Sequence, residues 1–556
     1  SGQLDRDCQC LVIHQQPSPH SRCWCFPPTT PHSPQAPHPP HLIKYPLRHR
    51  ILETKQLKLT NMYKPKLLLS LSFMLCSLLL LAQDTSLDLV LTGGRVIDPE
   101  TGLDDIRNVG IRGDRIVEIS SSSLRAKQSL DVSGLVVSPG FIDLHVHGMT
   151  PKAHEYQARD GVTTALELES GMLFLKDWIQ SKEGKSLVNY GASIPHSQLR
   201  ALAMEGYQHY FQEAEKIVAQ DGYGSPKLAK LMVNMRRAAY QSLSNDDIDR
   251  MKGLLKKELE AGALGVGVPV GYYPGSTHGE IFRVYEFAAA FQAPVFSHTR
   301  GFGLPGIQEA IANASASGAP LHIVHANSLS LAEIQVTLDM VAAAQKRGLD
   351  ITTEVYPYTA ASTYLQSSIF DEGWQKKLGI TYEDLQWEST GERLTETTFK
   401  EYRKKGGVVI IHMMKPEWIK KGIASPVTSI GSDGMPYAPK AHPRTAGTFS
   451  RVLGKYVREE QVITLAEAIR KMTLMPAQRL EGIAPAMRLK GRLQVGADAD
   501  ITVFDPATVI DKADFKGLQF SEGISHVLVN GRFVVRNGET VQDVFPGRPV
   551  VGRYKN

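Results

Sequence analysis

Imidazole and carboxylate side chains recur at the ends of short apolar runs between residues 140 and 435. Each run is followed by a polar stretch, so the polar groups come from well-separated parts of the chain. Nitrogen and oxygen ligands of this kind suit a borderline metal ion such as Zn²⁺. The sequence therefore predicts a site for one or two zinc ions, with the ligands His145, His147, Glu169, His298, His325 and Asp433.

The first two ligands form an HxH pair in the run GFIDLHVH. Residues two apart on a strand share a face and lie about 6.6 Å apart along it, so both imidazoles can face one site. With 18 His in the chain, such a pair alone is weak evidence. The carboxylates are stronger evidence, because a buried unpaired charge costs several kcal/mol. In TTALELE, both Glu167 and Glu169 qualify; we expect Glu169, nearer the strand end, to bind metal, with Glu167 as the alternative.

The elements that must position these groups lie between residues 139 and 487. Short apolar runs alternate there with helical stretches, which is typical of parallel β/α architecture. Eight or so strands over about 350 residues favour a (β/α)₈ TIM barrel, whose chemistry lies at the C-terminal ends of its strands. The expected strands are VVSPGFIDLHVH, VTTALELE, LVNYGAS, ALGVGVPV, PVFSHT, LHIVHA, ITTEVYPY, VVIIH and VTSIGSDG.

Two β-rich segments flank this barrel. Residues 84–138 alternate apolar and polar side chains between Gly-Gly, Asp-Pro and Gly-Asp turns, as do GADADITVFDP and HVLVNGRFVVRNGE within residues 488–556. The latter contains Asn530-Gly531, a strong hairpin signal. We expect one small β-sandwich domain assembled from both ends, with the barrel inserted between its halves.

The first 83 residues differ in character from the rest. Residues 1–61 are rich in Pro and lack an apolar period, which predicts a disordered upstream segment without function. Residues 62–83 resemble a signal peptide, with Lys64 and Lys66 before an apolar run of about 16 residues from Leu67 to Ala82; the alternative is a retained N-terminal anchor. We expect an exported protein, periplasmic or secreted, that meets a membrane only through this segment. All five Cys precede Asp84, so the presumed mature chain has neither disulfides nor thiolate ligands.

Charge excludes one class of partner. The formal net charge is +5, from 62 basic and 57 acidic side chains, without a dense basic run. A phosphate backbone requires such a run, so we expect no nucleic acid. The expected partner is a small molecule, and the sequence leaves open whether the chain forms a homo-oligomer.

Several motifs resemble the amidohydrolase superfamily and, within it, the N-acyl-D-amino-acid deacylases, or D-aminoacylases. PGFIDLHVHG and GADADITVFDP are typical of the superfamily, and HPRTAGTFSRVLGKYVRE after GSDG is typical of the deacylase branch. The resemblance implies hydrolysis of a linear amide, with an N-acyl D-amino acid as the leading substrate, by a hydroxide bound to zinc. It also implies that Asp433 is the catalytic general base and then the general acid.

The resemblance suggests substrate-binding residues as well. Arg444 in HPR occupies the place of a clamp for the substrate α-carboxylate, and a guanidinium fork suits a carboxylate. Tyr273, His442 and Arg300 are further expected pocket residues, and Tyr356 is a weaker one.

Two departures from the family pattern leave other functions open. Glu169-Ser170 stands where D-aminoacylases have a Cys ligand, and Asn327 stands where they have a second cation for the carboxylate. No Lys closes GVGVPVGYYPG, which disfavours a bridge of carbamylated lysine. The alternatives are a cyclic amidase, a heterocycle deaminase and an inactive exported binding protein. The last of these predicts a broken ligand set, and the sequence shows none broken.

Overall fold

The computed structural model describes residues 86–554 apart from residue 224, and all of them belong to the compact unit of residues 84–556. The expected signal peptide and the segment before it lie outside the described residues. Within the described part, no helix is both long enough and apolar enough to span a bilayer.

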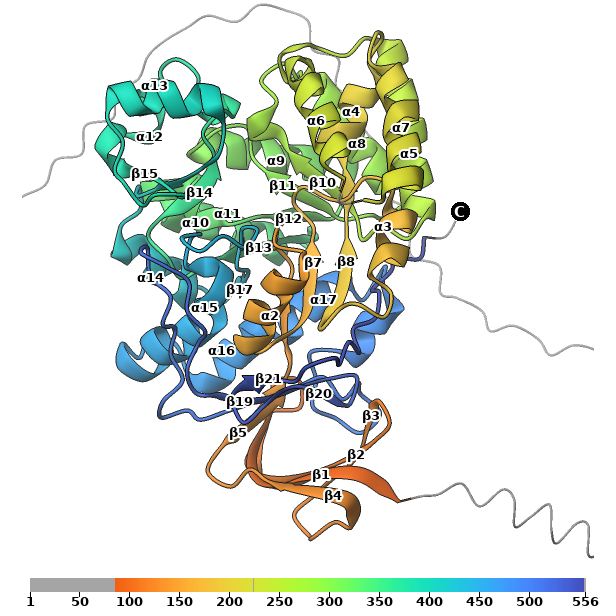
Figure 1. The fold of residues 1–556 in the computed structure, drawn as a ribbon, viewed down its shortest axis with the longest axis vertical. Coiled ribbons are helices and arrows are strands. Elements are labelled where there is room, and N and C mark those ends of the chain that lie inside the picture. Colours follow the sequence, from red (N-terminus) through yellow and green to blue (C-terminus); the bar gives the residue numbers. More distant parts are fainter. Residues whose placement is uncertain (1–85, 224, 555–556) are drawn as a thin grey trace, which may run out of the picture. The chain divides into compact units, whose positions relative to one another are not determined.

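A barrel of parallel strands forms the centre of this unit, and Figure 1 shows these strands from the side. Its strands form two parallel sheets, β6-β7-β8 and β9-β10-β11-β12-β13-β17. Only Ser193 separates β8 from β9, and a parallel bridge between Val146 and Gly434 joins the first strand to the last. The predicted (β/α)₈ barrel is therefore confirmed. Its strands are β6 (Phe141–Asp143), β7 (Val162–Glu167), β8 (Asn189–Ala192) with β9 (Ile194–Pro195), β10 (Val266–Pro269), β11 (Val295–His298), β12 (Leu321–Ile323), β13 (Ile351–Val355) and β17 (Thr428–Ile430).

Helices follow the strands along the chain and pack around them. In α7 (Asn245–Glu260), Ser244 caps the first turn in a capping box with Asp247, and Met251, Leu255 and Leu259 bury one face at helical spacing. The others are α2 (Pro151–Arg159), α3 (Leu175–Lys182), α4 (His196–Ala203), α5 (Gln208–Asp221), α6 (Pro226–Asn234), α8 (His278–Ala290), α9 (Leu304–Ser317), α10 (Ala326–Ser330), α11 (Ile334–Lys346), α14 (Pro416–Ala424), α15 (Arg444–Arg451), α16 (Leu465–Met472) and α17 (Leu474–Leu480).

Strands from both ends of the unit form a separate β domain, as predicted. Strand β18 pairs antiparallel with β5, so the two ends meet in one mixed nine-stranded sheet. Asn530 and Gly531 both have positive φ in the turn between β19 and β20, as the hairpin signal predicts. The strands are β1 (Leu87–Asp98), β2 (Leu103–Arg112), β3 (Arg115–Ser120), β4 (Ala126–Asp131), β5 (Val136–Pro139), β18 (Ile501–Phe504), β19 (Ile524–Val529), β20 (Arg532–Arg536) and β21 (Glu539–Thr540).

The motif GADAD connects this β domain to the barrel. One oxygen of Asp500 accepts hydrogen bonds from Lys490 Nζ at 2.6 Å and from Asn189 Nδ2, on strand β8, at 2.9 Å. The other oxygen accepts from the backbone N–H of Asn530 at 2.6 Å. Asp498 lies 2.8 Å from the same Lys490 ammonium. The two aspartates of this motif therefore hold the β domain against the barrel, and their contacts are not with the predicted metal ligands.

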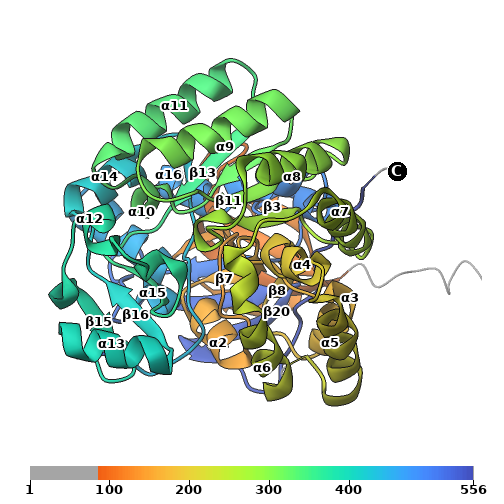
Figure 2. The same cartoon turned by 90° about the horizontal axis from the view of Figure 1, so that it is seen from above.

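The prediction of one barrel strand is wrong. The run VVIIH forms β16 (Val408–Ile411), the central strand of an antiparallel sheet with β14 (Ala361–Tyr364) and β15 (Leu385–Trp387). With α12 (Trp374–Leu378) and α13 (Glu396–Lys405), this sheet surrounds its own apolar core, which includes Trp387, Phe399 and Val409. A central antiparallel strand buried by its neighbours is as apolar as a barrel strand, so the pattern could not separate them. In Figure 2 this inserted lobe lies on one side of the barrel strands, and α3, α5, α6 and α7 lie on the other.

Candidate metal centre

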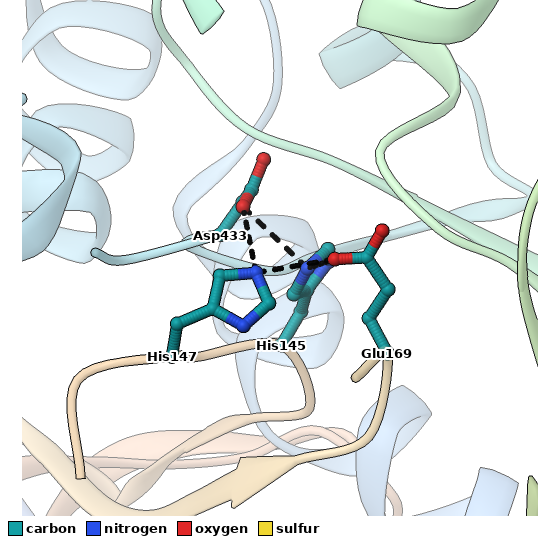
Figure 3. Close-up of side chains that lie close together, drawn as sticks. All are labelled: His145, His147, Glu169 and Asp433. Atoms are coloured by element: carbon teal, nitrogen blue, oxygen red, sulfur yellow. Dashed lines mark hydrogen bonds and ion pairs between the residues drawn. The ribbon is translucent and has the colours of Figure 1, made fainter. Parts of the chain in front are cut away.

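Four of the six expected ligands converge beyond the C-terminal ends of strands β6, β7 and β17 (Figure 3). Oε2 of Glu169 lies 3.0 Å from His145 Nε2 and 3.1 Å from His147 Nε2. Asp433 Oδ1 lies 3.5 Å and 3.4 Å from the same two nitrogens. One nitrogen or oxygen from each of the four residues thus faces a common point.

The remaining two expected ligands form a second group around the same glutamate. Oε1 of Glu169 lies 2.8 Å from Nδ1 of His298, which ends β11, and 3.6 Å from Nε2 of His325, which follows β12. In each group, the ligand atoms all lie within 4.8 Å of one another. Glu169 therefore belongs to both groups, with one carboxylate oxygen in each.

The donor set fits the metal that the sequence predicts. Both groups consist of imidazole nitrogens and carboxylate oxygens, the ligands that zinc prefers, and all of these residues are buried except His147, which is partly exposed. Burial alone raises the pKa of Asp433, but Arg444 and His145 outweigh it and hold this pKa well below its ordinary value. At Glu169, the charge of His145 and the hydrogen bonds with His145, His147 and His298 together outweigh burial and hold the pKa of that carboxyl well below its ordinary value. The carboxylates are therefore ionised, as metal ligands must be.

The backbone at two expected ligands is strained. Asp433 has φ +51° and His325 has φ +29°, values that non-glycine residues rarely adopt. Asp433 N donates to the carbonyl of His145 at 2.8 Å, and His147 N donates to the carbonyl of Gly434 at 2.7 Å. These bonds join the end of β17 to the end of β6 and hold Asp433 beside the HxH pair. Such strain is common where a site must be preorganised.

Glu167 lies in contact with the site but outside both groups. Its Oε2 lies 2.7 Å from His147 Nδ1, and its Oε1 accepts the backbone N–H of Ser170 at 3.0 Å. A carboxylate at Nδ1 leaves Nε2 to face the cluster, so Glu167 orients His147. Of the two candidates on this strand, the structure thus places Glu169 among the possible metal ligands.

Two buried carboxylates at the site were missed from the sequence. Glu354 Oε1, on β13, lies 2.5 Å from His145 Nδ1. Asp143 Oδ1 accepts the backbone N–H groups of His145 at 3.1 Å and Ser432 at 3.0 Å, and burial raises the pKa of Asp143 to about 7. The rule that singled out Glu169, a carboxylate within an apolar strand, applies equally to ITTEV and could have found Glu354.

Arg444, the expected clamp for the substrate carboxylate, lies next to the cluster. Its Nη1 lies 2.8 Å from Asp433 Oδ2, and its Nη2 donates to the carbonyl of Ser362 at 3.3 Å. The guanidinium also lies 4.8 Å from the ring centre of Tyr356. Arg444 is buried, and its Nε makes no hydrogen bond. The N–H of Nε is thus a buried donor without a hydrogen-bond partner beside the ionised Asp433.

The other expected pocket residues make different contacts. His442 donates from Nε2 to the carbonyl of Ala360 and accepts the backbone N–H of Arg444 at Nδ1. Burial and the Arg444 charge hold the pKa of His442 well below its ordinary value, so it is a neutral support for Arg444. Arg300 pairs with Glu309 at 2.9 Å and donates to the carbonyl of Ser276.

Of the two adjacent tyrosines in GYYPG, the structure brings Tyr272 to the site. The ring of Tyr272 lies 4.8 Å from that of His298, and its hydroxyl shares a 3.0 Å hydrogen bond with Thr363 of β14. Tyr273, the residue expected from the sequence, lies against Ser197 and Arg200. These two residues follow β9, so Tyr273 packs toward the third strand of the barrel.

Asn327, which replaces the second cation of the family pattern, is fully buried and tied to backbone. Its Nδ2 donates to the carbonyl of Tyr356 at 3.2 Å, and its Oδ1 accepts the N–H of the same residue at 3.4 Å. Its amide therefore holds the end of β13 in place.

The barrel and its His and carboxylate cluster define a metal-dependent hydrolase of the (β/α)₈ class. A family profile described as the Amidohydrolase family matches residues 196–535. The chain belongs to the amidohydrolase family, as the motifs predict.

Curated relatives and solved structures agree with this assignment. An N-acyl-D-glutamate deacylase of Alcaligenes xylosoxydans xylosoxydans is 32% identical, over 80% of this chain and 93% of the relative. A D-aminoacylase of the same organism is also 32% identical, over 80% and 93%. The structure of an N-acyl-D-glutamate deacylase from Bordetella bronchiseptica, complexed with zinc and a phosphonate inhibitor, matches with a TM-score of 0.70 and 25% identity. That match covers 84% of this chain and all of the other.

Proposed function

We propose that this protein is a zinc-dependent deacylase that hydrolyses the amide bond of N-acyl-D-amino acids. The observation that carries the proposal is that the buried Glu169 is shared between two groups of imidazoles at the end of the barrel. The similar proteins support the same reaction, since those named above are deacylases of this class and one solved structure contains zinc. We further propose two metal positions, one in each group.

A zinc ion bound there would lower the pKa of a water ligand toward about 7 and polarise the amide carbonyl. The chain's own residues do the rest. Asp433 Oδ1 faces both Nε2 atoms of the HxH pair and is ionised, so it can accept a proton and then give it to the departing nitrogen. This second transfer is needed because an amide nitrogen is a poor leaving group as an anion.

Arg444 would hold the substrate through its carboxylate. Charge-assisted hydrogen bonds to carboxylates are strong, and the Nε of this buried guanidinium has no hydrogen-bond partner. Because Arg444 also pairs with Asp433, a bound carboxylate would be placed next to the proton-transferring group. The leaving amino acid would thus have its nitrogen close to Asp433.

The test is hydrolysis by the purified protein loaded with zinc. We expect free amine and free acid from N-acetyl-D-amino acids, a strong preference over the L-enantiomers, and loss of activity on chelation with recovery on adding zinc. Asp433→Asn should bind zinc and fail to turn over. Release of ammonia from a heterocycle in place of an N-acyl substrate would establish a deaminase, and ring opening of a cyclic amide a cyclic amidase. Zinc binding without any hydrolysis would favour a binding protein.

We also propose that the protein is exported. The support is the sequence from Met62 to Gln83, with its basic start, apolar run and small residue before the expected cleavage point. Expression of the chain from Met62 with a C-terminal tag, followed by fractionation and N-terminal sequencing, tests this. A mature form that begins near Asp84 outside the cytoplasm is expected; an unprocessed cytoplasmic form would contradict export.

A further inference from the structure

We infer that Glu354 is a positioning residue for the metal centre. Its carboxylate sets the orientation and the tautomer of His145 and lies between three strand ends. The inference rests on the proposed zinc site. It starts from the contacts of one fully buried carboxylate on β13. Glu354 Oε1 lies 2.5 Å from His145 Nδ1 and accepts the backbone N–H of His325 at 3.4 Å. Its Oε2 lies 3.2 Å from His322 Nε2.

The first consequence concerns the tautomer of His145. A carboxylate at 2.5 Å from Nδ1 holds the ring proton on that nitrogen. The lone pair of a neutral imidazole is then on Nε2, the atom that faces Glu169 and Asp433. Imidazoles that bind metals are commonly fixed in this way by a carboxylate, which also makes the ring a better ligand.

The second consequence concerns the strand ends. Through one oxygen, Glu354 contacts His145 beyond β6 and the backbone of His325 beyond β12. Beyond β17, Gly431 leaves room for the same carboxylate, because a Cβ there would lie 2.5 Å from Glu354 Oε2. Residue 431 is thus a glycine because the carboxylate of Glu354 occupies the space that a side chain would need.

Glu354 itself is held from the other side. His322, whose Nε2 is near Oε2, has its Nδ1 2.8 Å from Thr352 Oγ1, and its ring packs 5.5 Å from that of Phe296. The hydrogen-bond partners of Glu354 are both at Oε1, and the ring of His322 lies against Oε2, so the buried carboxylate has little freedom to rotate. Glu354 can therefore hold the His145 ring in a fixed position.

Glu167 offers a comparison within the same site. It contacts one imidazole, His147 Nδ1, at 2.7 Å, and its other oxygen accepts a loop N–H. The side chain of His147 is 18% exposed, whereas that of His145 is 1% exposed. Glu354 therefore supports a more deeply buried ligand and spans more of the barrel than Glu167 does.

The experiment measures zinc affinity, by competition with a chromogenic chelator, in Glu354→Leu and Glu354→Gln. Leu has a similar volume and cannot accept a hydrogen bond, so we expect a 10- to 100-fold loss of affinity, the range known for such supporting groups. The Gln amide oxygen can still accept from Nδ1, so its affinity should stay within about 3-fold of wild type. With zinc saturating, kcat should fall in the Leu variant while KM changes little.

Glu280→Gln is the matched control, because Glu280 is a buried glutamate outside the site that pairs with Arg200. Its zinc affinity should equal that of wild type, even if its melting temperature falls. Wild-type zinc affinity in a folded Glu354→Leu protein would overturn the inference. If that variant does not fold, Glu354→Asp replaces it: the carboxylate is kept but is one methylene too short to reach His145, and unchanged affinity would again overturn the inference.

The same measurements separate this inference from the proposed function. Zinc binding and hydrolysis by wild type, together with unchanged zinc affinity in Glu354→Leu, would remove the role of Glu354 and leave the deacylase proposal intact. Absence of zinc binding in wild type would remove both.

Discussion

Arg444 Nη1 lies 2.8 Å from Asp433 Oδ2, and both side chains are buried beside the cluster of imidazoles. The guanidinium is thus shared between the expected proton-transfer group and the expected substrate carboxylate. This pairing connects substrate binding to the ionisation of Asp433, since Arg444 is one of the charges that lower the pKa of that carboxyl.

Arg444→Leu should therefore impair both binding and turnover. Hydrogen bonds to charged groups contribute about 1.5–3 kcal/mol each, so we expect kcat/KM to fall by about 10- to 100-fold or more. Arg444→Lys should recover only part of this loss, because an ammonium lacks the planar fork. Steady-state kinetics with N-acetyl-D-amino acids provide the measurement.

Arg300→Leu tests the other arginine expected from the sequence. Its guanidinium pairs with Glu309 and Ser276, so kcat/KM should change by less than about 3-fold. A loss as large as that of Arg444→Leu would mean that Arg300 moves into the site when substrate binds, and it would restore the sequence-based interpretation.

Replacement of the shared glutamate should empty the metal centre more than replacement of its neighbour. Glu169→Ala removes a ligand atom from both groups, so we expect zinc content by elemental analysis to fall to less than half of the wild-type value. Glu167→Ala removes only the support of His147 and should bind zinc more weakly, by about 10-fold, with unchanged content at saturation. Full zinc in Glu169→Ala, combined with its loss in Glu167→Ala, would reverse our assignment.

Removal of the metal should also lower stability. A ligand that binds only the folded state stabilises it by RT ln(1 + [L]/Kd), about 4 kcal/mol at a concentration of 1,000 times Kd. We expect the melting temperature to fall on chelation and to recover with zinc. Identical melting curves with and without chelator would argue against a zinc-binding centre.

The sequence predicted the barrel and the convergence of the six side chains because these residues end five separate apolar runs, one of which carries the HxH pair. In a parallel barrel all such ends lie on the same face, so one rule places residues that are far apart in the chain. The same rule could not distinguish β16, because an apolar run of four residues has no feature that separates a barrel strand from the centre of a small antiparallel sheet.

Positions on loops were less predictable. Tyr272 ends a short helical turn, Val270–Tyr272, and a rotation of one residue in such a turn decides which ring faces His298. Adjacent tyrosines carry no periodic signal that could decide between them. Glu354 was missed although the rule that selected Glu169 applies to it. It lies inside the expected strand ITTEVYPY and not at its end, and its contact with His145, 209 residues earlier in the chain, is seen only in the folded barrel.

The acidic motif GADAD provides a prediction about stability that is independent of the metal. Lys490 lies between Asp498 and Asp500, at 2.8 and 2.6 Å, and all three side chains are largely buried. Lys490→Met would leave two buried carboxylates without their cation, and such a loss costs about 3–5 kcal/mol. We therefore expect a clear decrease in the free energy of unfolding in urea, with zinc affinity unchanged in the folded protein. Lys400→Met is the control, because the Lys400–Glu396 pair is exposed and such pairs contribute little to stability. Equal effects of the two substitutions would show that the β domain is held to the barrel by apolar packing, and that the charges of the motif contribute little.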